Sequence, residues 1–242
     1  INIDEGIPLA DEAEFDILYA DLYPTQAQQL NDWLCDGNDQ SALALGGQIG
    51  SGKSTLLNKV VSTATVEPDV WLNFDEDASN PSLGDFIAIT LAGLIEAILT
   101  NHLAFIDSST LIDDLLIEFD GTLIDEMSAS SLASHWQILH QRLNPSKKSL
   151  KGFREKRLAV DLINDAKNTP YFLTAITALI DDFKQGSGRL PLIVASGIDK
   201  FPAGSPAFFV LKAVLEKLQD AKTLYEINAI HFYAAECQFS SM

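Results

Sequence analysis

A glycine-rich turn between two apolar segments constrains the fold of this chain more than any other feature. The turn spans residues 47–54 and has the sequence Gly-Gln-Ile-Gly-Ser-Gly-Lys-Ser. Residues 41–45 before it form a short apolar run of the kind found in buried parallel strands. Residues 54–61 after it repeat apolar side chains with the period of a helix face. The pattern therefore predicts a strand, a tight turn and a helix in direct succession.

The residue types in this turn suit the binding of phosphate groups. Glycines let the backbone turn tightly and bring its N–H groups close to phosphate oxygens. Lys53 can reach the terminal phosphates of a nucleotide, and the Ser54 hydroxyl can bind Mg²⁺. The N-terminus of the following helix adds free N–H groups and a partial positive charge. The expected phosphate contacts are Gly47, Gln48, Ile49, Gly50, Ser51, Gly52, Lys53, Ser54 and Thr55.

On this motif the chain resembles the P-loop NTPases, because the turn fits G-x-x-x-x-G-K-[ST] at every fixed position. The resemblance is greatest to AAA+ and to STAND or KAP-like ATPases. It implies an α/β, three-layer P-loop fold with a mainly parallel sheet, binding ATP and Mg²⁺. It also implies an ATPase that acts as a switch or motor in a larger assembly, with Lys53 among its catalytic residues.

Further apolar runs predict the other strands and the domain organisation. After the strand at 41–45, strands are expected at 68–74, 190–195 and 227–235. The long stretch between the second and third strands predicts a helical insertion at about 100–185, followed by a loop at 185–188. The predicted parts are an acidic lead-in with a framing helix at 1–40 and the P-loop nucleotide-binding domain at 41–242.

The resemblance also implies carboxylates that hold Mg²⁺ and orient the attacking water. Ser196 stands where the family has its first acid, after the strand at 190–195, and Asp199 stands where a second acid is expected. Three alternatives follow. In the first, Asp199 is both metal ligand and catalytic acid. In the second, Asp75 is the metal ligand and Glu76 the catalytic acid. In the third, the domain binds nucleotide without hydrolysing it. Turn and helix-capping roles also suit these acids.

The resemblance places a residue that senses the terminal phosphate at the end of the fourth strand. Glu236 and Gln238 are the nearest candidates there. His231, within the same apolar run, better fits a core histidine with a hydrogen-bond partner.

Charge is distributed unevenly along the chain. The net charge is −18, and residues 1–141 contain 24 Asp or Glu but only two basic residues, Lys53 and Lys59. Such an acidic surface would repel nucleic-acid backbones, so nucleic acid is not an expected partner. Seven basic residues then fall within 142–157. They fit a solvated face, a docking patch for a phosphate-bearing or acidic partner, or an arginine lid or finger formed by Arg154 and Arg157.

Two alternative functions remain open at this stage, a small-molecule or nucleotide kinase and a nucleotide-binding scaffold without hydrolysis. The absence of an Asn-Lys-x-Asp motif favours ATP over GTP. The two cysteines, Cys35 and Cys237, are far apart in the sequence, which suits a protein of the reducing cytoplasm. The sequence has no uninterrupted run of 18 apolar residues, so no membrane span is predicted. The expected partners are a nucleoside triphosphate and a protein, either another protein or a second copy of the chain.

Overall fold

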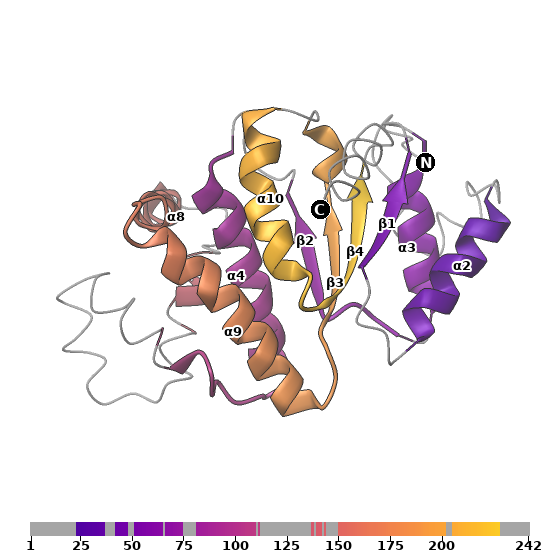
Figure 1. Cartoon of the computed structure of the whole chain (residues 1–242), viewed down its shortest axis with the longest axis horizontal. Helices are drawn as coiled ribbons and strands as arrows, with labels where there is room; N and C mark the ends of the chain where they lie inside the picture. The colour runs from indigo at the N-terminus through magenta and orange to yellow at the C-terminus, as the bar shows by residue number, and fades with distance from the viewer. Residues whose placement is uncertain are drawn as a thin grey trace, which may run out of the picture.

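The computed structural model describes residues 23–36, 42–47, 51–64, 66–74, 81–109, 111, 137, 139–141, 143, 150–201 and 205–227, with the backbone alone at 150–155, 199 and 227. These residues form a sheet flanked by helices (Figure 1). The elements in chain order are α2 (Pro24–Cys35), β1 (Ala42–Gly46), α3 (Lys53–Thr63), β2 (Val70–Asn73), α4 (Leu83–Thr100), α8 (Leu150–Ile163), α9 (Thr169–Ser187), β3 (Leu192–Ser196), the short 3-10 helix η1 (Ile198–Lys200), α10 (Pro206–Leu218) and β4 (Lys222–Ile227).

The four described strands form one parallel sheet in the order β1-β4-β3-β2. β4 therefore lies between β1 and β3, and it pairs with both along its length. Because all four strands run in one direction, their carboxyl ends meet at one edge of the sheet. In open α/β sheets this edge is where ligands bind.

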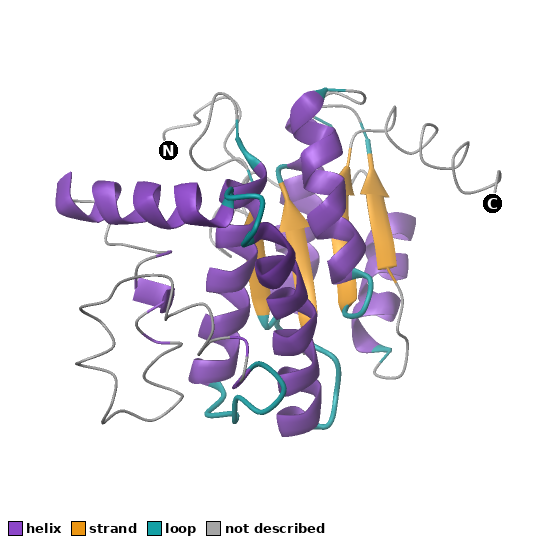
Figure 2. Cartoon of the chain, turned by 60° about the vertical axis from the view of Figure 1, so that its left-hand side comes forward, coloured by secondary structure: helices purple, strands orange, loops and turns teal. Residues whose placement is uncertain are grey.

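The chain passes from the first edge strand of the sheet to the opposite edge strand, and its later strands fill the positions between them. The connection through α3 leads from β1 to β2 at the opposite side of the sheet, and later connections bring β3 and β4 back toward β1. Right-handed crossovers in opposite directions place their helices on opposite faces. Accordingly, α2 and α3 cover one face, whereas α4, α9 and α10 cover the other (Figure 1, Figure 2).

The side chains of β3 alternate between two hydrophobic clusters. Leu192 and Val194 pack in the cluster formed with α2 and α3, which includes Leu57. Ile193 and Ala195 belong to the larger cluster around α4. Since both faces of this strand are buried, its sequence is continuously apolar, as expected for a strand inside a parallel sheet.

The helix α4 occupies the centre of the larger cluster. A capping box starts it, in which the Ser82 hydroxyl accepts from the Asp85 N–H at 3.3 Å and the Asp85 carboxylate accepts from the Ser82 N–H at 2.8 Å. By length and composition, α4 is the one helix of the described residues that could cross a membrane. Its packing against β2, α8, α9 and α10 accounts for this apolar sequence.

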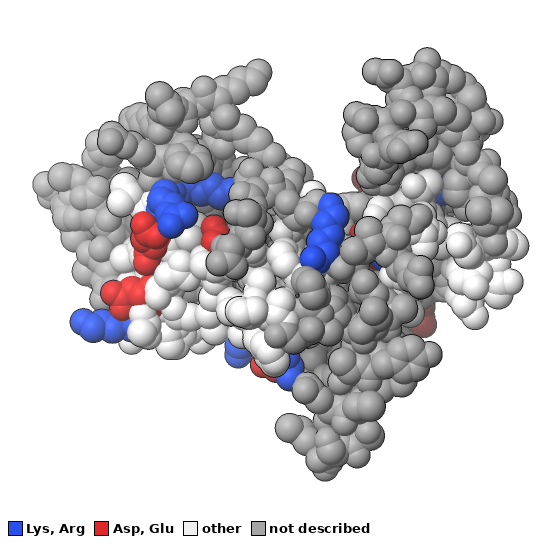
Figure 3. Space-filling model, turned by 90° about the horizontal axis from the view of Figure 1, so that it is seen from above, with Lys and Arg blue, Asp and Glu red and all other residues white. Residues whose placement is uncertain are grey.

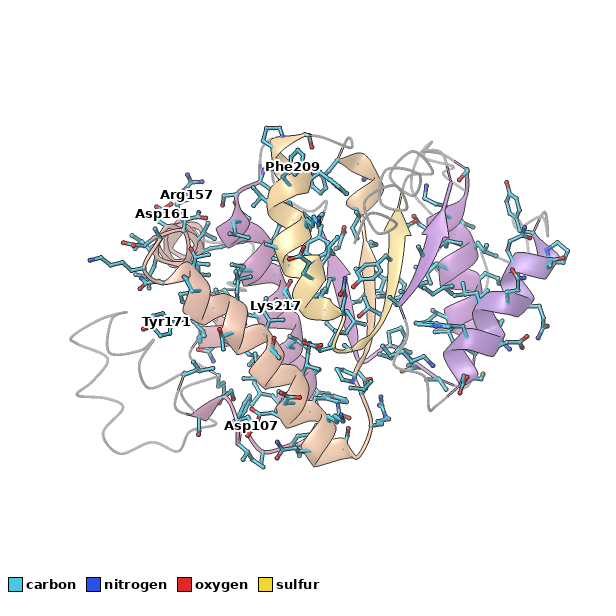
Figure 4. The ribbon with its side chains drawn as sticks, viewed as in Figure 1. Asp107, Arg157, Asp161, Tyr171, Phe209 and Lys217 are labelled. Carbon is cyan, nitrogen blue, oxygen red and sulfur yellow. The ribbon has the colours of Figure 1, made fainter. Side chains whose placement is uncertain are left out.

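Buried charged groups fasten distant segments to the core. Lys222 at the start of β4 donates from Nζ to the carbonyls of Leu34, at 3.3 Å, and Asp36, and so caps the carboxyl end of α2. Asp182 of α9 accepts from the N–H groups of residues 106–108 and from the Ser108 hydroxyl. The turn held in this way includes Asp107, which lies beside α9 (Figure 4).

Most of the predicted strands and helices agree with the structure, and the α/β class with a parallel sheet is confirmed. The runs at 41–45, 68–74 and 190–195 overlap β1, β2 and β3, and helices α4, α8 and α9 lie between β2 and β3. The predicted loop at 185–188 is wrong, because α9 continues to Ser187 and ends at Gly188, whose φ of 75° suits glycine.

The fourth described strand lies earlier in the chain than the predicted one. β4 spans Lys222–Ile227, and the run at 227–235 lies beyond it, outside the described residues apart from Ile227. The polar residues that make 222–227 an unobvious strand have hydrogen-bond partners in the fold. For example, the Thr223 hydroxyl donates to the Leu218 carbonyl at 2.9 Å.

Replacing Gly84 by alanine is expected to destabilise the contact between α4 and α8. A Cβ at this position would lie 2.7 Å from the Val160 carbonyl oxygen and 2.9 Å from the Asn164 side chain, which holds the Gly84 N–H. Overpacking of this kind costs about 1–3 kcal/mol, more than the helix propensity of alanine returns. Urea unfolding should show the loss. Gly46→Ala, where a Cβ would meet nothing within 4 Å, is the control and should leave stability nearly unchanged.

Candidate functional site

The glycine-rich turn connects the end of β1 to the start of α3 at the carboxyl edge of the sheet. Gly47 follows β1 directly, and Gly52 caps α3 with a φ of 82°, a left-handed conformation that favours glycine. Lys53 is the first residue of α3, so the lysine and the helix N-terminus stand at the same place. Residues 48–50, with Gln48, Ile49 and Gly50, lie outside the described residues.

The Lys53 side chain folds back over this turn. Its Nζ donates to the Gly47 carbonyl oxygen at 3.1 Å, and the residue is only 6% exposed. A Cβ on Gly47 would lie 2.6 Å from the Ser51 hydroxyl and 3.3 Å from carbons of the Lys53 side chain. The side chains of Ser51 and Lys53 therefore pack closely over Gly47, and a larger residue at position 47 would have to displace them.

A buried carboxylate from β4 lies next to the start of α3. Glu226 is 2% exposed and is paired across the sheet with Leu45 of β1. The Ser54 hydroxyl donates a hydrogen bond to Glu226 Oε1. This contact joins residues 172 positions apart in the sequence. Sequence analysis missed Glu226 because the fourth strand was expected further along the chain.

Polar side chains lie side by side at the ends of neighbouring strands, on the face of the sheet that α3 covers. Glu226 of β4 and Ser196 of β3 are two of them. Alternation from Leu224 places Glu226 on this face, and alternation from Val194 places Ser196 there as well. Ser196 is paired with Asn73, the last residue of β2. The end of β3 thus carries a neutral hydroxyl, which donates to the Leu72 carbonyl at 3.2 Å, and the acid lies on the neighbouring strand.

Several predicted site residues lie beside this contact, and others are not described. Ser51 and Thr55 flank Lys53 and Ser54 at the turn and in the first turn of α3. Asp199 lies in η1, directly after β3, with its backbone alone described. The remaining predicted residues outside the described part are Asp75, Glu76, His231, Glu236 and Gln238.

The described groups at this edge include hydroxyl and carboxylate oxygens, the Lys53 ammonium and the N–H groups at the start of α3. Among the described residues no group of three or more His, Cys, Asp or Glu side chains could hold a metal ion. A cation beside Ser54 and Glu226 would therefore need further oxygens from a ligand or from water. Tyr225, adjacent on β4, is not available as a base, because burial raises its pKa to about 12.

The described part of the basic segment lies far from this turn. Arg157 pairs with Asp161 one turn along α8, with the Nε and Oδ1 atoms 3.5 Å apart and both side chains mainly exposed. α8 lies at the opposite end of the molecule from β1 and α3 (Figure 4). Seen along the strands, basic and acidic groups alternate over that end (Figure 3). This arrangement fits a solvated charged face; the Arg154 side chain is outside the described atoms.

Comparison with known proteins assigns the chain to no family. No family model matches it, and no curated protein or solved structure does so either.

The Ser54–Glu226 contact should contribute measurably to the stability of the protein. A hydrogen bond to a charged acceptor is worth about 1.5–3 kcal/mol, so the double-mutant cycle of Ser54→Ala and Glu226→Ala should give a coupling free energy of that size. Chemical denaturation of the four proteins measures it. The same cycle with Glu216→Ala, an exposed acid on α10 that pairs with Lys212, should show almost no coupling. A near-zero value for Ser54 and Glu226 would contradict the contact.

Proposed function

We propose that this chain is a P-loop ATPase domain that binds ATP with Mg²⁺ at the carboxyl edge of its sheet. The observation that carries the proposal is the start of α3. There a left-handed Gly52 leads directly into Lys53 and Ser54, next to the end of β1. This combination supplies a helix N-terminus, a lysine and a hydroxyl at one point, as a bound triphosphate requires.

The electrostatics of the chain support binding of an anion at this point. Lys53 is one of two basic residues in the first 141, whereas Asp and Glu number 24 there. The helix N-terminus adds the equivalent of about half a positive charge. A phosphate group is therefore expected to be attracted to this turn, where one of the few basic residues of a strongly acidic part of the sequence lies.

Binding would exchange one partner of Lys53 for a stronger one. Its Nζ donates to the neutral Gly47 carbonyl at 3.1 Å. The lysine ammonium makes a charge-assisted bond with either acceptor, but a phosphate oxygen carries negative charge and therefore attracts the ammonium more strongly than a neutral carbonyl oxygen does. We infer that Lys53 leaves the carbonyl and turns to the phosphates when ATP binds. The side chain then needs no new cavity in the core, because it already lies along the turn.

Mg²⁺ fits this site through oxygen ligands. The Ser54 hydroxyl offers one, and phosphate oxygens and water offer others, in line with the preference of Mg²⁺ for oxygen. The bound ion would neutralise charge that develops on the phosphates during transfer. Lys53 would bind and orient the terminal phosphate, while Asp199, in the 3-10 helix after β3, is the proposed residue that orients the attacking water.

A second candidate function is a nucleotide-gated scaffold that does not hydrolyse ATP. Ser196 favours it, because a neutral hydroxyl stands at the end of β3 and donates to the Leu72 carbonyl. In either case we propose that the domain works in the cytoplasm with a protein partner or a second copy of itself. A kinase is less well supported, since Arg157 of the suggested lid pairs with Asp161 on α8.

Lys53→Ala is expected to weaken ATP binding at least 100-fold and to leave the fold intact. The reason is that the variant loses the cation that contacts phosphate, while α3 keeps its buried Leu56, Leu57 and Val60. Fluorescence anisotropy with a labelled ATP analogue measures the affinity, and circular dichroism checks the fold. Lys59→Ala, six residues further along the same helix, is the matched control and should bind ATP as well as the unmodified protein. Equal affinity of a folded Lys53→Ala protein would overturn the proposal.

Turnover separates the ATPase from the scaffold. For the ATPase, release of phosphate should require Mg²⁺, and Asp199→Ala should reduce it at least tenfold with ATP affinity changed less than about threefold, because the residue acts on water rather than on the nucleotide. Tight ATP binding without phosphate release, alone and with candidate partner proteins, would favour the scaffold.

A further inference from the structure

We propose that Glu226 anchors the divalent cation of the ATP site and does so from β4. This inference rests on the proposed function and adds to it a metal-binding carboxylate that sequence analysis did not find. In the P-loop ATPases that the chain resembles, the corresponding acid is expected at the end of the strand that here ends in Ser196. In this protein the acid lies one strand closer to β1.

The Ser54 hydroxyl and the Glu226 carboxylate lie in direct contact, so both groups can reach one ion. Mg²⁺ prefers oxygen ligands, and a hydroxyl and a carboxylate are both ligands of this kind. A cation that binds here would replace the hydrogen bond between the two groups. The Ser54 hydroxyl is the same group that the glycine-rich motif assigns to Mg²⁺.

Burying the Glu226 carboxylate costs free energy even though it accepts a hydrogen bond, because the charge is removed from water. The position continues the row of Leu224, and an apolar side chain there would extend the core against α3. Outside the glycine-rich turn, the other buried ionisable groups among the described residues each hold a turn or a helix end in place. Asp182 fixes the turn at 106–108, and Lys222 caps α2. Glu226 instead lies at the ligand-binding edge beside Lys53 and Ser54.

The sheet order explains how an acid on β4 can replace one on β3. β4 is the direct neighbour of β1, whereas β3 is one strand further away, and strands are about 4.8 Å apart. A carboxylate at the end of β4 is therefore closer to the turn after β1 than a carboxylate of the same length on β3. Ser196 and Glu226 lie on the same face of the sheet, so a negative charge at both positions would also bring two carboxylates together, which is unfavourable.

The experiment measures ATP affinity with Mg²⁺ and with EDTA in the unmodified protein and in Glu226→Gln. With Glu226 present, Mg²⁺ should tighten ATP binding at least tenfold. In Glu226→Gln we expect Mg²⁺ to increase the ATP affinity less than threefold. The ATP affinity in EDTA should stay equal or improve, because the variant lacks a negative charge next to the phosphates. Glu216→Gln on the surface of α10 is the matched control and should keep the full gain. Electron paramagnetic resonance of Mn²⁺ with ATP gives a second measure, and Glu226→Gln should bind the ion at least tenfold more weakly.

The possible outcomes separate the metal role from the proposed function. If Mg²⁺ increases the ATP affinity of Glu226→Gln as much as that of the unmodified protein, the metal role of Glu226 is overturned, but ATP binding is not. The same conclusion follows if the unmodified protein binds ATP equally well with and without Mg²⁺. Absence of ATP binding by the unmodified protein overturns the proposed function itself. If Glu226→Gln does not fold, Glu226→Asp decides. Its carboxylate is one methylene shorter, so a metal ligand predicts an intermediate gain, and an unchanged gain counts against the proposal.

Discussion

The parallel pairing of β4 with β1 on one side and β3 on the other is the constraint on which the structure depends. This pairing closes the sheet between its first strand and the later ones, and it aligns the carboxyl ends of β1, β3 and β4. It also brings Ser54, near the start of the domain, against Glu226. The hydrophobic clusters on the two faces then hold this arrangement, because β3 contributes alternate side chains to both.

The sequence predicted well what depends on local pattern. The glycine-rich turn, the strands at β1, β2 and β3 and most helices follow from apolar periodicity and from the special conformations of glycine. β4 was misplaced because its segment begins with Lys222 and includes Glu226, and each of these polar residues is satisfied by a partner far away in the sequence, at the end of α2 and at the start of α3. No local pattern contains that information, so the principal new residue of the candidate site emerged only from the strand pairing.

Buried charges in this protein have two distinguishable environments. Asp182 and Lys222 meet backbone groups of nearby turns and helix ends, which satisfies them within the folded chain. Lys53 and Glu226 lie at the edge where the strands end, against the glycine turn and its serine. The first environment stabilises a turn and a helix end, whereas in the second a ligand could replace the present hydrogen-bond partners of the side chains.

Lys222 and Glu226 also have a mechanical consequence for the strand that carries both. They lie four residues apart on one face of β4, with Leu224 between them, and they hold the end of α2 and the start of α3 respectively. The distance between Lys222 and Glu226 along β4 therefore sets the distance between these two helix ends on the same face of the sheet. A slip of β4 by one residue would turn all three side chains to the opposite face and release both helices together, so this pair of contacts locks the register of the central strand.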